Sequence, residues 1–173
     1  MIAAWLLASA LAAEPAACPE EYLPLPDQLS VVWVSPVRKR AHAKTLLPVV
    51  ATQDLREWMA KEQPSVGRLL QRLGMRKKSK EPKRKYKVVI FDIRSGDLCR
   101  PMDTVNDGTG VSGLPSCLGG SGNATRKYSG CGFTTDQKTG ARAFDLYRIP
   151  WANAASRGFC VFPAERFVAE GSR

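Results

Sequence analysis

One segment limits what this chain can fold into. Residues 94–132 hold nine of the fourteen glycines and three of the five cysteines. Glycine loses the most backbone freedom on ordering, so it weakens helices and strands alike. Loops longer than about 15 residues are uncommon in compact domains unless they are functional or tied down. We therefore expect 94–132 to form a glycine-rich loop, with regular structure limited to short elements on either side.

The cysteines suggest how this loop is tied down. Cys99, Cys117, Cys131 and Cys160 form no CxxC pair, and with His42 as the single histidine the chain shows no short zinc-ligand spacing, so we expect no zinc site. Four cysteines allow three pairings, among which spacing does not decide. We favour Cys117–Cys131, which would close the loop, together with Cys99–Cys160, which would join it to a C-terminal strand. Closing a loop of about 15 residues contributes roughly 3 kcal/mol by restricting the unfolded chain.

Residues 1–12 have the pattern of a secretory signal peptide. Residues 2–11 are apolar or small except for Ser9, and 10–12 give a small-x-small cleavage site. The run is shorter than the roughly 20 residues that span a bilayer, and no Lys or Arg precedes it. We expect a secreted or periplasmic protein in which disulfides form. A buried N-terminal segment and a different start codon are the alternatives.

Residues 13–28 contain four prolines and predict an extended lead-in to the folded part. Two bridges among the downstream cysteines would leave Cys18 without a partner. Ala17 suits the position before a lipidated cysteine, whereas Pro15 does not suit the aliphatic position of that motif. A free or intermolecular Cys18 is therefore the leading interpretation, and a lipoprotein anchored through Cys18 is the lesser one.

Apolar patterns predict strands in the next part of the chain. The β-branched and aromatic run 31–34 predicts a strand. Residues 88–91 form a four-residue apolar run, which is typical of a buried, central strand. Residues 45–50 contain Pro48, which lacks an N–H, so we expect an edge strand at most.

Helical spacing places apolar residues on one face over 52–62 and again over 66–73. We expect Thr52 to cap the first helix and Gly74 to end the second in a left-handed conformation. Both apolar stripes are interpreted as core packing.

The C-terminal part predicts a hairpin and two further helices. Residues 136–140 form a turn between strands at 132–135 and 141–149. Short helices after Pro150 and Pro163 flank a strand at 159–162. The sum is one small α+β domain over 29–173, with four or five short strands in one sheet packed by two to four short helices.

Positive charge is concentrated in one part of the chain. The net charge is +10, and residues 68–87 contain ten Lys and Arg against the single acid Glu81. Residues 75–85 are predicted to be an exposed basic linker whose positive potential attracts anions. Arg68 and Arg72, on the polar face of a predicted helix, would extend it, and a smaller basic group occupies 38–44. The predicted anion-binding residues are Arg76, Lys77, Lys78, Lys80, Lys83, Arg84, Lys85 and Lys87.

Few residues suggest catalysis. His42, the single histidine, lies among cations that oppose its protonation, and no nucleophile motif accompanies it. A carboxylate pair for hydrolysis would have to come from Asp92, Asp97, Asp103 and Asp107, which are close only in sequence. Residues 103–108 lack the third-position oxygen of a calcium loop. The sequence points to no catalytic residue, metal or cofactor.

Three functions compete. The leading hypothesis is an exported, disulfide-stabilised, non-catalytic protein of the cell envelope or exterior. Its basic loop would bind an anionic membrane surface, a polysaccharide or an acidic protein. The second is an intracellular nucleic-acid-binding protein, with 76–78 and 83–85 as a bipartite nuclear signal, although Tyr86 alone could stack on a base. The third is a secreted hydrolase or inhibitor built on the loop 99–131.

Overall fold

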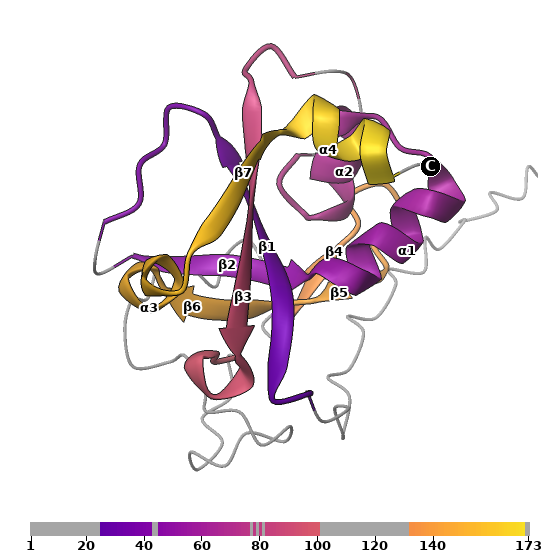
Figure 1. Ribbon diagram of the computed structural model, residues 1–173. Helices are drawn as coiled ribbons and strands as arrows, with labels where there is room; N and C mark the ends of the chain where they lie inside the picture. The colour runs from indigo at the N-terminus through magenta and orange to yellow at the C-terminus, as the bar shows by residue number, and fades with distance from the viewer. Residues whose placement is uncertain are drawn as a thin grey trace, which may run out of the picture.

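The computed structural model describes residues 25–42, 45–76, 78, 80, 82–100 and 132–171. The predicted leader, most of the proline-rich lead-in and most of the glycine-rich loop lie outside these residues. In chain order the described elements are β1 (Gln28–Pro36), β2 (Leu46–Ala51), α1 (Thr52–Glu62), α2 (Val66–Arg72), β3 (Tyr86–Arg94), the 3-10 helix η1 (Ser95–Asp97), β4 (Phe133–Thr135), β5 (Arg142–Asp145), β6 (Tyr147–Pro150), α3 (Trp151–Ser156), β7 (Phe159–Pro163) and α4 (Ala164–Gly171) (Figure 1). No helix in the described part of the chain is long and apolar enough to cross a membrane.

Five of the strands form one antiparallel sheet with the order β6-β2-β1-β3-β7, and β4 pairs with β5 in a second sheet. The predicted α+β class is confirmed. The expected single sheet of four or five strands is wrong, because seven strands in two sheets are described. The apolar run 88–91 lies in β3, which has a neighbour on both sides, so its predicted internal position is confirmed.

The two sheets arise because the strand predicted at 141–149 is divided at Leu146. β5 before it pairs with β4, and β6 after it pairs with β2. Leu146 is buried, and its amide donates to the carbonyl of Gly132 at 2.8 Å. The predicted hairpin turn at 136–140 is confirmed, and Gly140 supplies its positive φ of 73°.

Pro48 corrects the prediction that β2 is an edge strand, because β2 lies between β6 and β1. Pro48 faces Arg148 on β6. The amide and carbonyl of Arg148 bond to Cys99 instead, at 2.8 and 2.9 Å, so β6 needs no N–H from Pro48. On the other side, β1 pairs with β2 only at Val31↔Ala51 and Val32↔Val50. The proline is tolerated because neither ladder requires a donor at its position.

β1 buries both of its faces, since successive side chains of a strand point in opposite directions. Val32 and Val34 join a core covered by α1, α2 and α4, the three helices grouped at the upper right of Figure 1. Val31 and Trp33 join a second core that includes Leu47 from β2 and is closed in part by α3. β1 and β3 therefore form the wall shared by two hydrophobic clusters.

The helix ends agree with the predicted caps only in part. Thr52 is the first residue of α1 rather than its cap, and its hydroxyl donates to Ser30 Oγ at 3.0 Å. The predicted Thr52 cap is thus wrong because a side chain of β1 engages the hydroxyl. α2 is capped by Ser65, whose Oγ accepts from the amide of Arg68 at 3.2 Å. Gly74 has the predicted positive φ, 73°.

The predicted Cys99–Cys160 bridge is wrong. Cys160 is a free, exposed thiol on β7, whereas Cys99 is disulfide-bonded. The sheet order explains this outcome, because Cys99 pairs with Arg148 beside β6 and Cys160 lies on the strand at the opposite edge. A disulfide needs Cα atoms within about 7 Å of each other. The other predicted pair, Cys117–Cys131, lies outside the described residues.

We predict that Gly132→Ala destabilises the fold by about 3 kcal/mol, from a left-handed φ and an overpacked core. Gly132 has φ +69°, and an added methyl would overlap the side chain of the buried Arg100, with Cδ only 2.7 Å away. Gly140→Ala is the matched control, because its φ is +73° with nothing within 4 Å. Urea unfolding of both variants measures the difference. Equal losses would contradict a packing role for Gly132.

Candidate functional site

Two basic stretches that are far apart in sequence meet at one end of the β1–β3 pair. Pro36 at the end of β1 faces Tyr86 at the start of β3, and beyond them the amide of Val37 donates to the carbonyl of Lys85 at 3.0 Å. The chain turns back after Pro36, whose carbonyl accepts from the amide of Lys39 at 2.9 Å. A cavity of about 610 Å³ lies here, which we call the basic groove. Its described lining is Pro36, Val37, Arg38, Lys83, Arg84 and Lys85.

The described lining of the basic groove is positively charged. It holds four cations and no carboxylate, and all four cations are exposed. None of them forms an ion pair with a residue in the described ranges. Val37 lies among them with 49% of its surface exposed, so the groove also presents an apolar side chain to solvent. A cluster of positive charges raises the local concentration of anions.

The predicted anion-binding residues separate into several positions. Lys83, Arg84 and Lys85 line the basic groove, whereas Lys87 lies on β3 with its ammonium 5.6 Å from the centre of the Trp33 ring. Arg76 donates to the carbonyl of Lys80 at 3.2 Å, outside the groove lining. Lys78 and Lys80 are exposed, and Lys77 lies outside the described residues. The structure adds Arg38, which the sequence placed in a separate, smaller basic group.

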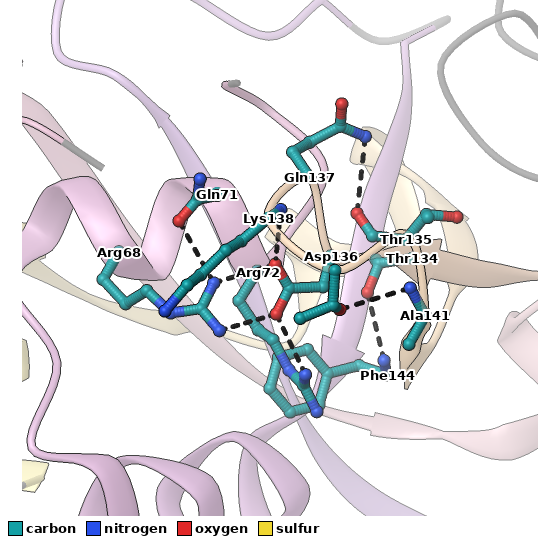
Figure 2. Close-up of polar contacts among 11 residues, drawn as sticks. Arg68, Gln71, Arg72, Thr134, Thr135, Asp136, Gln137, Lys138, Ala141 and Phe144 are labelled. Carbon is teal, nitrogen blue, oxygen red and sulfur yellow. Dashed lines mark hydrogen bonds and ion pairs between the residues drawn. The ribbon is translucent and has the colours of Figure 1, made fainter. Parts of the chain in front are cut away.

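Arg68 and Arg72 do not extend the basic surface as predicted. Both bind Asp136, which is fully buried in the β4–β5 turn (Figure 2). Arg68 donates from Nη1 to Oδ1 at 2.8 Å and from Nη2 to Oδ2 at 2.6 Å, and Arg72 Nη1 donates to Oδ2 at 3.1 Å. We call this group the Asp136 clamp. It fixes α2 to the hairpin and offsets part of the positive charge of the two arginines.

Further donors complete the clamp. The amide of Lys138 donates to Asp136 Oδ1 at 2.9 Å, and Gln71 Oε1 accepts from Arg68 Nη1 at 3.2 Å. The hydrogen bonds from Arg68, with those from Lys138 and Arg72, hold the pKa of Asp136 far below its ordinary range, although burial acts in the opposite direction. The same hydrogen bond raises the pKa of Arg68. The clamp is therefore ionised at neutral pH.

The catalytic candidates are not gathered into a site within the described residues. His42 is exposed in a turn, where its amide donates to Thr45 Oγ1 at 3.0 Å. Asp97 pairs with Arg157 at 2.8 Å, and Asp92 is exposed on β3, towards the strand end opposite the basic groove. Asp103 and Asp107 lie outside the described residues. No group of three potential metal ligands occurs among the residues that the structure describes.

Comparisons with known proteins add no family to these observations. No protein-family model, no curated protein and no solved structure matches this chain. Function is therefore inferred from the charge, geometry and burial of its own residues.

Asp136→Asn should destabilise the protein by about 3 kcal/mol at pH 7, because the two arginines lose their buried counter-charge. The pKa of Asp136 is lowered by folding, so the clamp contributes fully above the unfolded pKa of about 3.9 and loses strength as the pH falls below it. The gap between wild type and variant should therefore narrow below pH 4 by about 1.4 kcal/mol per pH unit. Urea unfolding at pH 7 and pH 3 measures this difference in stability.

Glu170→Gln, in the exposed pair with Arg166, is the control and should change stability by less than about 1 kcal/mol. A gap that is independent of pH would refute the clamp.

Proposed function

We propose that this protein is exported and binds an anionic membrane surface through the basic groove, without catalysing a reaction. The observation that carries the proposal is the convergence of two basic stretches around an exposed apolar residue, Val37. A disulfide at Cys99 supports export, since disulfides persist mainly in oxidising compartments.

Membrane physics accounts for both parts of the groove. Each Lys or Arg close to an anionic bilayer contributes about 1 kcal/mol, so the four lining cations together supply several kcal/mol. The Val37 side chain gains further by entering the boundary between headgroups and acyl chains. A soluble polyanion would use the cations equally well but would leave Val37 in water. The apolar residue therefore favours a membrane over a soluble polyanion.

Nucleic acid is the less favoured partner. Binding to single strands relies on aromatic rings on which bases stack. The described lining of the basic groove contains no aromatic residue, and Tyr86 at its base is partly buried against the core under α1, α2 and α4. Nucleic acid and acidic polysaccharide are the alternative partners. The binding experiments therefore compare vesicles with heparin and an oligonucleotide.

Replacing Lys83, Arg84 and Lys85 together by Gln should weaken binding to vesicles that contain phosphatidylglycerol by about 100-fold, at about 1 kcal/mol per cation. Vesicle co-sedimentation measures the affinity. The control replaces Arg56, Lys61 and Lys138 by Gln, since they are exposed, lie outside the basic groove and carry the same total charge. Binding of the wild type should also fall with added salt. Equal losses in the two triple variants would mean that net charge, and not the groove, determines binding.

Val37→Ser should weaken vesicle binding by about fivefold, which corresponds to about 1 kcal/mol of lost apolar burial, and leave heparin binding unchanged. Val161→Ser on β7 is a matched control, because Val161 is 51% exposed and is not among the described residues that line the groove. If heparin or the oligonucleotide binds more tightly than vesicles and Val37→Ser has no effect, the membrane proposal is wrong. The partner would then be a soluble polyanion.

A further inference from the structure

A second cavity lies between α1 and β5, away from the basic groove. Its volume is about 460 Å³, and Arg72 at the end of α2 completes its lining. We call it the α1–β5 cleft. It shares no described lining residue with the basic groove, so whatever it binds is independent of the function proposed above. Its size falls within the range of about 300–1,000 Å³ that small-molecule sites occupy.

Aromatic rings and one guanidinium line the cleft in a fixed arrangement. Trp58 and Phe144 meet edge to face, with their ring centres 5.7 Å apart. The guanidinium of Arg72 lies 5.8 Å from the Trp58 ring centre and 5.4 Å from that of Phe144. Because buried Asp136 holds Arg72, as Figure 2 shows, this side chain is ordered before any ligand arrives. The cleft therefore offers a preorganised apolar surface beside hydrogen-bond donors.

The charges around these rings balance. The lining contains three carboxylates and three cations. Arg142 pairs with Asp145, Arg72 pairs with Asp136, and Glu57 accepts a hydrogen bond from Gln53 at 3.0 Å. The cleft consequently has little net attraction for a polyanion or a polycation. It presents both donors and acceptors instead.

Asp54 is the acceptor best placed for a ligand. It lies in the first turn of α1 and forms no hydrogen bond or ion pair with another described residue. Burial, followed by the charges of Asp145 and Glu57, raises the pKa of its carboxyl, so both acids lie near it. A neutral hydroxyl donor would relieve this carboxylate without disturbing the pairs around it.

We propose that the α1–β5 cleft binds a neutral saccharide. A sugar ring has a C–H face that packs on an indole such as Trp58, and hydroxyls that both donate to carboxylates and accept from guanidinium groups. Arg142 and Asp54 supply these two kinds of partner on the cleft wall. A free amino acid or peptide terminus carries full charges, whereas the lining holds equal numbers of carboxylates and cations, and three of these six side chains are ion-paired. The balance therefore selects a neutral polyhydroxyl ligand.

The test uses the full chain, with cellotetraose, maltotetraose and the β-1,4-linked tetramer of N-acetylglucosamine as probes at millimolar concentration. Two-dimensional NMR follows the indole N–H signals, and a Trp58→Phe variant assigns the Trp58 signal. We expect at least one probe to shift the Trp58 signal and to leave those of Trp33 and Trp151, which pack in the other core, in place. No shift with any of the three probes, or a stronger response to glutamate than to every sugar, would overturn the proposal.

Single variants localise the site. Asp54→Asn and Arg142→Gln should each weaken saccharide binding by about tenfold, because each loses a charged hydrogen-bond partner. Asp92→Asn is the matched control, since Asp92 is exposed on β3 and lines none of the described cavities. Equal effects of Asp54→Asn and Asp92→Asn would contradict the assignment. The variant with Lys83, Arg84 and Lys85 replaced by Gln should bind the saccharide normally, so that failure of one proposal is distinguishable from failure of the other.

Discussion

The antiparallel pairing of β1 with β3 is the interaction on which the rest of this structure depends. It runs through nine matched positions, from Gln28↔Arg94 to Pro36↔Tyr86. Its register sends Val31 and Trp33 into one core and Val32 and Val34 into the other. A slip by one residue would exchange the two sets, so both cores hold the register in place. The same register puts the end of β1 beside the start of β3 and thereby creates the basic groove.

Local sequence signals predicted much of the fold. The errors arise where the structure depends on contacts between residues that are far apart in the sequence. The two helices after β2 and the turn at 136–140 follow from spacing and from glycine, which act within a few residues. The internal position of β2 could not be predicted in this way. Pro48 is tolerated there only because neither neighbouring strand needs a hydrogen-bond donor at this position. Likewise, Leu146 divides one apolar stretch between two sheets, which depends on what each half pairs with.

The sites show the same limit. The sequence predicted a binding role for Lys83, Arg84 and Lys85, but their combination with Arg38 depends on the β1–β3 register. Basic residues directly after one strand and directly before its antiparallel neighbour were the available signal. For Arg68 and Arg72, no signal in the sequence distinguishes a solvent-exposed helix face from a buried ion pair, since their partner Asp136 lies more than sixty residues away. The aromatic and charged lining of the α1–β5 cleft also comes from three distant segments.

The Asp136 clamp divides the charge of the molecule between the two surfaces. Without a buried counter-charge, Arg68 and Arg72 would add to the positive potential of the chain and would remain free to move. Asp136 offsets part of this charge, whereas the four cations that line the basic groove form no ion pair with a described residue. It also orients Arg72 between the Trp58 and Phe144 rings, which gives the α1–β5 cleft an ordered donor with little excess charge. One buried carboxylate thus lets a strongly basic chain present an anion-attracting surface and a nearly neutral cleft at the same time.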